Sequence, residues 1–176
     1  MDGNRAYVAG KISFDHLGDL RHHSADHQNP PVTVLSCSDS RVPPELIFNR
    51  SIDQLFVIRV AGNVAADFEL ASIEFAIANG YTKMIVVMGH DACGAVKAAM
   101  APGEPPTPSL AVLVQRIRQS TGKTASLDAA IAANARASAR YLLDHSKVIR
   151  DAVDSKKVGL VVAVYHLDSG VVERLK

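Results

Sequence analysis

Four runs of apolar residues without polar alternation occur along the chain, and each predicts a buried strand. They span residues 31–36, 54–60, 83–89 and 158–167. Continuous β-branched and aliphatic runs of this length are typical of parallel strands that are covered on both faces. We therefore expect the four segments to lie side by side in one sheet.

The segments between these runs have the spacing of helices. In 65–78, apolar residues three and four positions apart form two stripes, which predicts a largely buried helix. Residues 109–119 and 126–144 predict two more helices, with Ser109 and Ser126 as candidate N-caps. Because strands alternate with helices, the fold class is α/β, with a mostly parallel central sheet flanked by helices.

Length and charge restrict the organisation and the partners. The 176 residues fit a single domain over 1–176 with one core, since no break in composition marks a second unit. The formal net charge is +1, and no basic cluster suggests binding to nucleic acid or to an anionic membrane. No apolar segment is long enough to span a bilayer, and the N-terminus lacks the apolar stretch of a signal peptide. We expect a cytoplasmic protein.

The residues best suited to chemistry follow the first and third runs. LSCSDSR (35–41) ends one run and MGHDACG (88–94) ends the other. Ligands of parallel α/β sheets bind beyond the carboxyl ends of the strands, so these two loops should meet at the functional edge. The chain has two cysteines, one in each loop, and in a reducing compartment metal binding or catalysis is their first explanation.

Cys37, His90 and Cys93 are the candidate metal ligands. His90 and Cys93 are three positions apart at a strand-to-helix turn, where one helical turn would put both side chains on the same side. Thiolate and imidazole are preferred ligands of zinc, and three protein ligands with an open fourth position are typical of catalytic zinc. We expect one zinc ion per chain, with water at the open position.

Asp39 and Arg41 fit the same site as a pair. Asp39 is close enough to Cys37 to reach the metal or to accept a hydrogen bond from its water, and Arg41 could orient the carboxylate bidentately. Simpler explanations exist for each residue alone, such as an inert buried cysteine or a surface turn with an ion pair. Together, at the ends of strands, the residues favour a catalytic metal site.

The chain resembles the β-class carbonic anhydrases at these motifs and over nearly all of its length. The matching segments, in order, are GNRAYVAGK (3–11), CSDSRVPPELIF (37–48), LFVIRVAGN (55–63), SIEFAI (72–77), GHDACGAV (89–96) and VYHLDSG (164–170). The resemblance implies that Cys37, His90 and Cys93 bind zinc and that Asp39 and Arg41 form the catalytic dyad. It also implies a homodimer or a higher homo-oligomer.

The resemblance further implies a substrate site of the plant-type subtype. Gln28 matches a glutamine that hydrogen-bonds CO2 or bicarbonate, and Phe56, Ala61 and Phe75 match positions that line an apolar pocket.

A second subtype is gated by bicarbonate, bound by a tryptophan, an arginine and a tyrosine. Here Arg59 and Tyr165 match the last two, but the chain contains no tryptophan and has Val34 at that position. This departure argues against bicarbonate gating, although Asp39 could still replace water as fourth zinc ligand at low pH.

The function implied by the resemblance is zinc-dependent, reversible hydration of CO2 to bicarbonate and a proton, by attack of zinc-bound hydroxide. Two alternatives remain open at the level of sequence. The same scaffold could hydrolyse carbonyl sulfide or carbon disulfide, which are linear molecules attacked in the same way. The chain could also be a non-catalytic zinc-binding protein, although such a protein would not need Asp39, Arg41 and Gln28.

Overall fold

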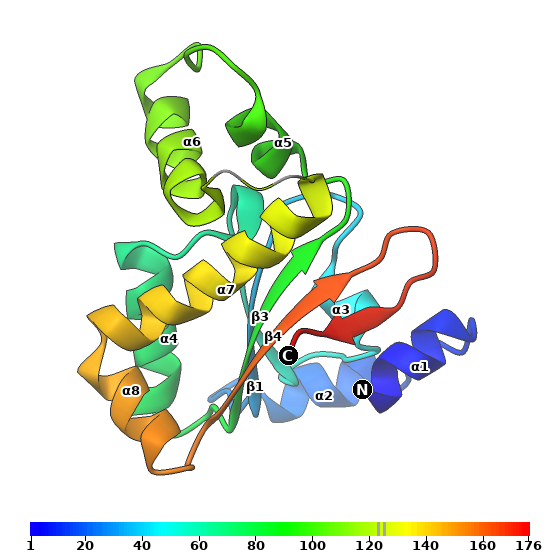
Figure 1. Cartoon of the computed structure of the whole chain (residues 1–176). Helices are drawn as coiled ribbons and strands as arrows, with labels where there is room; N and C mark the ends of the chain where they lie inside the picture. Colours follow the sequence, from blue (N-terminus) through cyan, green and yellow to red (C-terminus); the bar gives the residue numbers. More distant parts are fainter. Residues whose placement is uncertain (123, 125) are drawn as a thin grey trace.

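The computed structural model describes residues 1–122, 124 and 126–176, and its centre is a five-stranded sheet in the order β2-β1-β3-β4-β5 (Figure 1). The first four strands are parallel, and β5 is antiparallel to β4. The strands are β1 (Val32–Ser36), β2 (Leu55–Arg59), β3 (Met84–His90), β4 (Gly159–Tyr165) and β5 (Val172–Arg174). The α/β class and the four strands expected from the apolar runs are confirmed, each strand to within two residues at either end. The short strand β5 was not predicted.

Helices alternate with these strands along the chain. They are α1 (Asp2–Val8), α2 (Leu17–His23), α3 (Pro44–Ile47), α4 (Asp67–Ala78), α5 (Gly94–Met100), α6 (Pro108–Thr121), α7 (Leu127–His145) and α8 (Lys147–Asp154), with a 3-10 turn η1 (Ala61–Asn63). The cap expected at Ser126 is confirmed, because its side chain accepts a hydrogen bond from the Ala129 amide. The cap expected at Ser109 is wrong. Thr107 caps α6 instead, since Pro108 suits the first helical position and starts the helix earlier.

The two faces of the sheet are covered unequally. Helices α4, α7 and α8 pack on one face, where Leu35, Ile85 and Val87 belong to the main core. The short helices α1 and α3 cover part of the other face, above Met88 and Ala163. A mostly apolar cavity of about 260 Å³ remains there, lined by side chains of all five strands. The expectation that every strand is buried on both faces therefore fails at this part of the sheet and at the half-buried edge strand β2.

Helix α4 is less buried than its sequence predicted. Ile73 and Ala76 are fully buried against the core, but the side chain of Phe68 is 86% exposed and that of Phe75 is 52% exposed. The helix carries two apolar stripes, and the sheet covers one of them. The second stripe forms an apolar surface on the outside of the chain.

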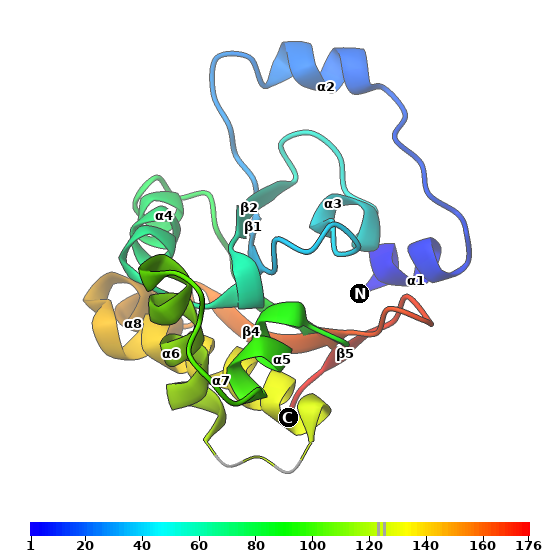
Figure 2. The ribbon, with the colours of Figure 1, turned by 90° about the horizontal axis from the view of Figure 1, so that it is seen from above.

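The N-terminal segment combines a well-anchored helix with one that stands apart. The side chain of Asn4 in α1 is buried and forms hydrogen bonds with the carbonyl groups of Ile47 and Gly170 and with the Val172 amide. Helix α2, in contrast, has no buried residue, and Figure 2 shows it held away from the sheet by two extended linkers.

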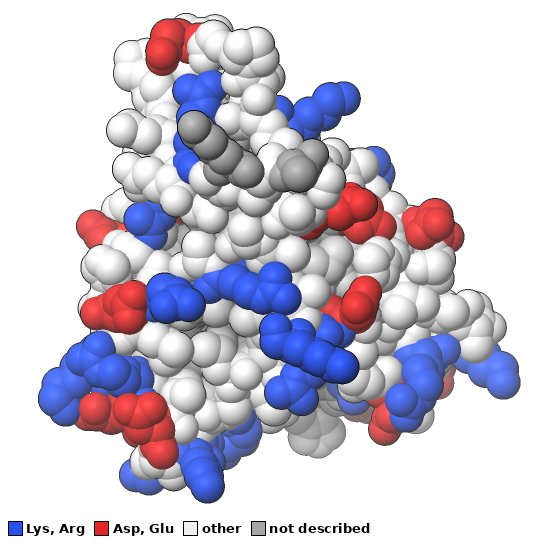
Figure 3. All heavy atoms as spheres, viewed as in Figure 1, with Lys and Arg blue, Asp and Glu red and all other residues white. Residues whose placement is uncertain are grey.

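Charged side chains of both signs are spread over the face seen in Figure 3. Basic residues gather over α7 and the C-terminal strand, where Arg136, Arg140 and Arg174 line one shallow pocket. Among the residues that the structure describes, no helix has the length and apolar character needed to cross a bilayer.

Candidate metal centre and active site

Cys37 lies directly beyond the carboxyl end of β1, in a buried position. Its Sγ accepts two backbone hydrogen bonds, from the Asp39 amide at 3.4 Å and from the Gly62 amide at 3.2 Å. Backbone N–H groups aimed at a sulfur favour its thiolate form. The loop after β1 and the turn η1 therefore prepare Cys37 to act as an anionic ligand.

His90 and Cys93 come from the next strand of the sheet. His90 is the last residue of β3 and Cys93 is the N-cap of α5, so the expected shared helical turn is wrong. The chain instead reverses through Ala92, whose φ of 51° is left-handed. The Nδ1 of His90 lies 2.8 Å from the Asp91 carbonyl oxygen, which can only accept a hydrogen bond. Nδ1 must therefore carry the proton, and the lone pair of Nε2 is free to bind a metal.

The structure brings the three predicted ligands together. One ligand atom from each of Cys37, His90 and Cys93 lies within 4.8 Å of the others, and all three residues are buried. Tetrahedral zinc with two sulfurs and one nitrogen needs separations of about 3.5 to 3.8 Å between these atoms, which small rotations would reach. The Nε2 of His90 is also buried without a hydrogen-bond partner among the described residues. A metal ion would satisfy that atom, so the residues fit zinc.

The two sulfurs lie in contact with each other. A hydrogen bond from Cys93, helped by contacts with His90 and the two backbone amides, outweighs burial and lowers the pKa of Cys37. The same contact and burial raise the pKa of Cys93. A cation bound between the two sulfurs would favour the thiolate form of both.

Asp39 and Arg41 form the bidentate pair that their spacing suggested. Arg41 Nε donates to Asp39 Oδ1 at 2.9 Å, and a terminal guanidinium nitrogen donates to Oδ2 at 2.7 Å. These hydrogen bonds hold the pKa of Asp39 well below its usual range, against a smaller opposing effect of burial. The same Oδ2 lies 3.9 Å from Nε2 of His90. An ionised carboxylate thus stands beside the metal ligands.

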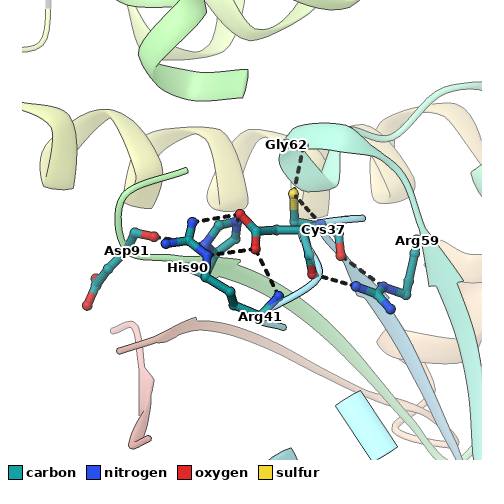
Figure 4. A network of polar contacts seen from close by, with 7 residues as sticks. Cys37, Arg41, Arg59, Gly62, His90 and Asp91 are labelled. Atoms are coloured by element: carbon teal, nitrogen blue, oxygen red, sulfur yellow. Dashed lines mark hydrogen bonds and ion pairs between the residues drawn. The ribbon is translucent and has the colours of Figure 1, made fainter. Parts of the chain in front are cut away.

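Arg59 has a role here that the sequence did not reveal. From the end of β2, its guanidinium donates to the carbonyl oxygens of Cys37 at 3.0 Å and Asp39 at 2.6 Å (Figure 4). It therefore holds the loop that carries both the ligand and the carboxylate. The motif LFVIRVAGN singled out this segment, but no pattern in it indicated which carbonyl groups the arginine would contact.

Comparison with known proteins agrees with this geometry. Residues 32–172 match the family model described as carbonic anhydrase. A carbonic anhydrase of Mycolicibacterium smegmatis is 35% identical over 98% of this chain and 88% of its own length. The chain belongs to the carbonic anhydrase family.

Two solved structures of β-class carbonic anhydrases share the fold of this chain. A β-carbonic anhydrase of Coccomyxa has a TM-score of 0.80 at 23% identity, covering 99% of this chain and 83% of its own. One of two tetrameric β-carbonic anhydrases of Sordaria macrospora has a TM-score of 0.77 at 23% identity, covering 99% and 93%.

The residues matched to the substrate site of carbonic anhydrases lie in two places. Ala61 is in η1, next to the amide that contacts Cys37. Phe56 pairs with Thr33, four residues before Cys37 and therefore about 13 Å away along the strand. The ring of Phe75 stacks near that of Phe56, with centroids 6.4 Å apart. The exposed Gln28 precedes β1, at the same end. One chain therefore does not bring Gln28, Phe56 and Phe75 to its own metal ligands.

A second ionic cluster lies behind the metal centre. His166 Nδ1 lies 2.9 Å from a carboxylate oxygen of Asp91, and Nε2 lies 3.1 Å from one of Glu173. A carboxylate can only accept a hydrogen bond, so each nitrogen of this ring has to donate one. An imidazole donates from both nitrogens only when it is protonated to imidazolium. Although burial opposes protonation, Glu173 and Asp91 raise the pKa of His166. Asp91 links the two sites, because its carboxylate contacts His166 while its main-chain carbonyl oxygen accepts the hydrogen bond from His90.

The cluster predicts a stability that falls as pH rises. A histidine whose pKa is raised by folding stabilises the fold fully below its unfolded value of about 6.5, and this contribution is lost as pH rises through the folded value. We expect His166→Gln to lower the melting temperature more at about pH 6 than at about pH 9. Scanning calorimetry of both proteins at the two pH values measures this. An equal decrease at both would contradict a charged His166.

Proposed function

We propose that this chain catalyses the reversible hydration of CO2 to bicarbonate and a proton, as a single domain over 1–176 with one zinc ion per chain. The observation that carries the proposal is the position of Asp39. A carboxylate held ionised by Arg41 lies beside three buried groups that fit zinc. A purely structural metal site would not need this pair.

Cys37, His90 and Cys93 would hold the zinc. When bound, it supplies the Lewis acidity that makes water a nucleophile near neutral pH. Oδ2 of Asp39, which lies 3.9 Å from Nε2 of His90, would be placed to accept a hydrogen bond from a water molecule in the site and to orient it toward CO2. Arg41 keeps the carboxylate ionised and fixed, so Asp39 does not hold the proton itself. Displacement of water by Asp39 at low pH would first require this bidentate contact to break.

The amide of Gln28 and the rings of Phe56 and Phe75 would reach the site from a second copy of the chain. These residues lie at the opposite end of the sheet from their own metal ligands. The exposed apolar stripe of α4 and the unburied helix α2 provide a surface that a dimer would cover. In a two-fold dimer each chain could complete the other's pocket. The Sordaria macrospora relatives are tetrameric, which is compatible with such a dimer as a building block.

The subtype without bicarbonate gating is part of the proposal. The Arg59 guanidinium is engaged by two loop carbonyl groups, and the hydroxyl of Tyr165 is hydrogen-bonded to that of Tyr7 at 2.9 Å. With Val34 in place of tryptophan, the set of three residues that would bind bicarbonate is incomplete. We expect a soluble cytoplasmic enzyme whose partner is the small substrate and not nucleic acid or membrane.

Asp39→Asn tests the catalytic role. The amide cannot pair as a carboxylate with Arg41, so kcat/KM for CO2 hydration should fall by roughly 100-fold or more. Zinc content should stay at the wild-type level, because Asp39 is not one of the three ligands. Stopped-flow hydration assays and metal analysis measure both.

The matched control is Asp154→Asn, which changes an exposed carboxylate on α8 and should keep full activity. Unchanged activity in Asp39→Asn, or preferred turnover of carbonyl sulfide by the wild type, would contradict the proposal.

Mixed dimers test the shared site. Gln28→Ala and Asp39→Asn chains, each impaired alone, should form a heterodimer in which one site combines Asp39 of one chain with Gln28 of the other. Two affinity tags isolate that species after co-expression. We expect it to recover roughly half of the wild-type rate, since one of two symmetry-related sites is complete. A heterodimer no more active than its parents would show that Gln28 acts within its own chain.

A further inference from the structure

The turn η1 reaches the metal centre in an unusual backbone conformation. Gly62 has a φ of 70° and Asn63, directly after it, a φ of 44°. A side chain on Gly62 would bring a Cβ within 2.8 Å of Ile117 Cδ1 and 3.1 Å of Ala95 Cβ. Only glycine fits this conformation and this space. The conformation matters because it aims the Gly62 amide at the sulfur of Cys37, 3.2 Å away.

Asn134 fixes this turn from α7. Its side chain is almost completely buried, and Nδ2 donates to the Gly62 carbonyl oxygen at 2.6 Å. Its Oδ1 accepts from Ser120 Oγ of α6 at 2.8 Å. Both ends of the amide are therefore engaged, one by the turn and one by the neighbouring helix. A continuous series of hydrogen-bonded groups runs from Ser120 through Asn134 and Gly62 to a metal ligand.

We propose that Asn134 is a positioning residue that tunes the metal through Cys37, an inference that rests on the proposed zinc site. By holding the Gly62 carbonyl, Asn134 keeps the adjacent amide directed at the sulfur. A hydrogen bond to a thiolate ligand draws electron density away from the sulfur, so the ligand donates less to the metal. Asn134 thereby sets both the position of Cys37 and the electron density that the metal receives.

The test uses the metal as a spectroscopic probe. Cobalt(II) replaces zinc in the wild type, Asn134→Ala and Ser120→Ala, and the sulfur-to-cobalt charge-transfer absorption is recorded. Loss of the amide contact makes the thiolate a stronger donor, so the band of Asn134→Ala should move to longer wavelength. Because the sulfur of Cys37 is also no longer held in position, the zinc affinity, measured by competition with a chelator, should weaken roughly tenfold despite the stronger donor. Ser120→Ala, which leaves the Asn134 donor in place, should change both in the same direction and by less.

Ser146→Ala separates tuning from simple loss of stability. Ser146 is a buried cap of α8 that bonds Glu74 and the Ile149 amide, remote from η1. Its replacement should lower the melting temperature and leave the cobalt spectrum and the zinc affinity unchanged. A folded Asn134→Ala protein with the wild-type spectrum and affinity would overturn the inference. If that variant does not fold, unchanged values in Ser120→Ala overturn it. A wild type that binds neither ion would instead overturn the proposed zinc site itself.

Discussion

The arrangement of this protein depends on one constraint, the burial of two sulfur atoms and an imidazole nitrogen in the same small space. Burying such groups is costly unless each is hydrogen-bonded or bound to a metal. The fold meets part of this need with hydrogen bonds. Two backbone amides donate to the sulfur of Cys37, and the Asp91 carbonyl oxygen accepts from Nδ1 of His90. One nitrogen, Nε2 of His90, is left for a metal ion. In the proposed function, the carboxylate of Asp39 and the guanidinium of Arg41 next to this centre would make it a catalytic site and not a structural one.

The parallel sheet explains how distant residues meet. Because β1 and β3 are neighbours and point the same way, their carboxyl ends deliver Cys37 and His90 to one edge. The strand β2, on the other side of β1, brings Arg59 and η1 to the same edge. The side chain of Asn134, in helix α7, then donates a hydrogen bond to the Gly62 carbonyl oxygen and so holds η1 in place. The opposite edge carries Phe56 and Phe75, which the sequence associates with substrate. Because these rings lie far from the metal ligands of their own chain, the proposed function requires a second chain.

The sequence predicted the features that depend on local pattern. Apolar runs located four strands, and strand ends located Cys37, His90, Asp39 and Arg41. It did not predict features that depend on which surfaces meet. The two apolar stripes of α4 look alike in sequence, yet the sheet covers one of them. Asn134 lies 72 residues from Gly62, and a polar residue in an alanine-rich helix gives no sign of the turn it will hold. The placement of Gln28 and Phe56 away from the metal also followed from topology, which periodicity does not encode.

X-ray absorption at the zinc edge of the purified protein reports which atoms surround the metal. We expect two sulfur neighbours at about 2.3 Å, one imidazole nitrogen and one further light atom. That set corresponds to Cys37, Cys93, His90 and an open position that takes water. Fewer than two sulfur neighbours would contradict the assignment of Cys37, Cys93 and His90 as the zinc ligands.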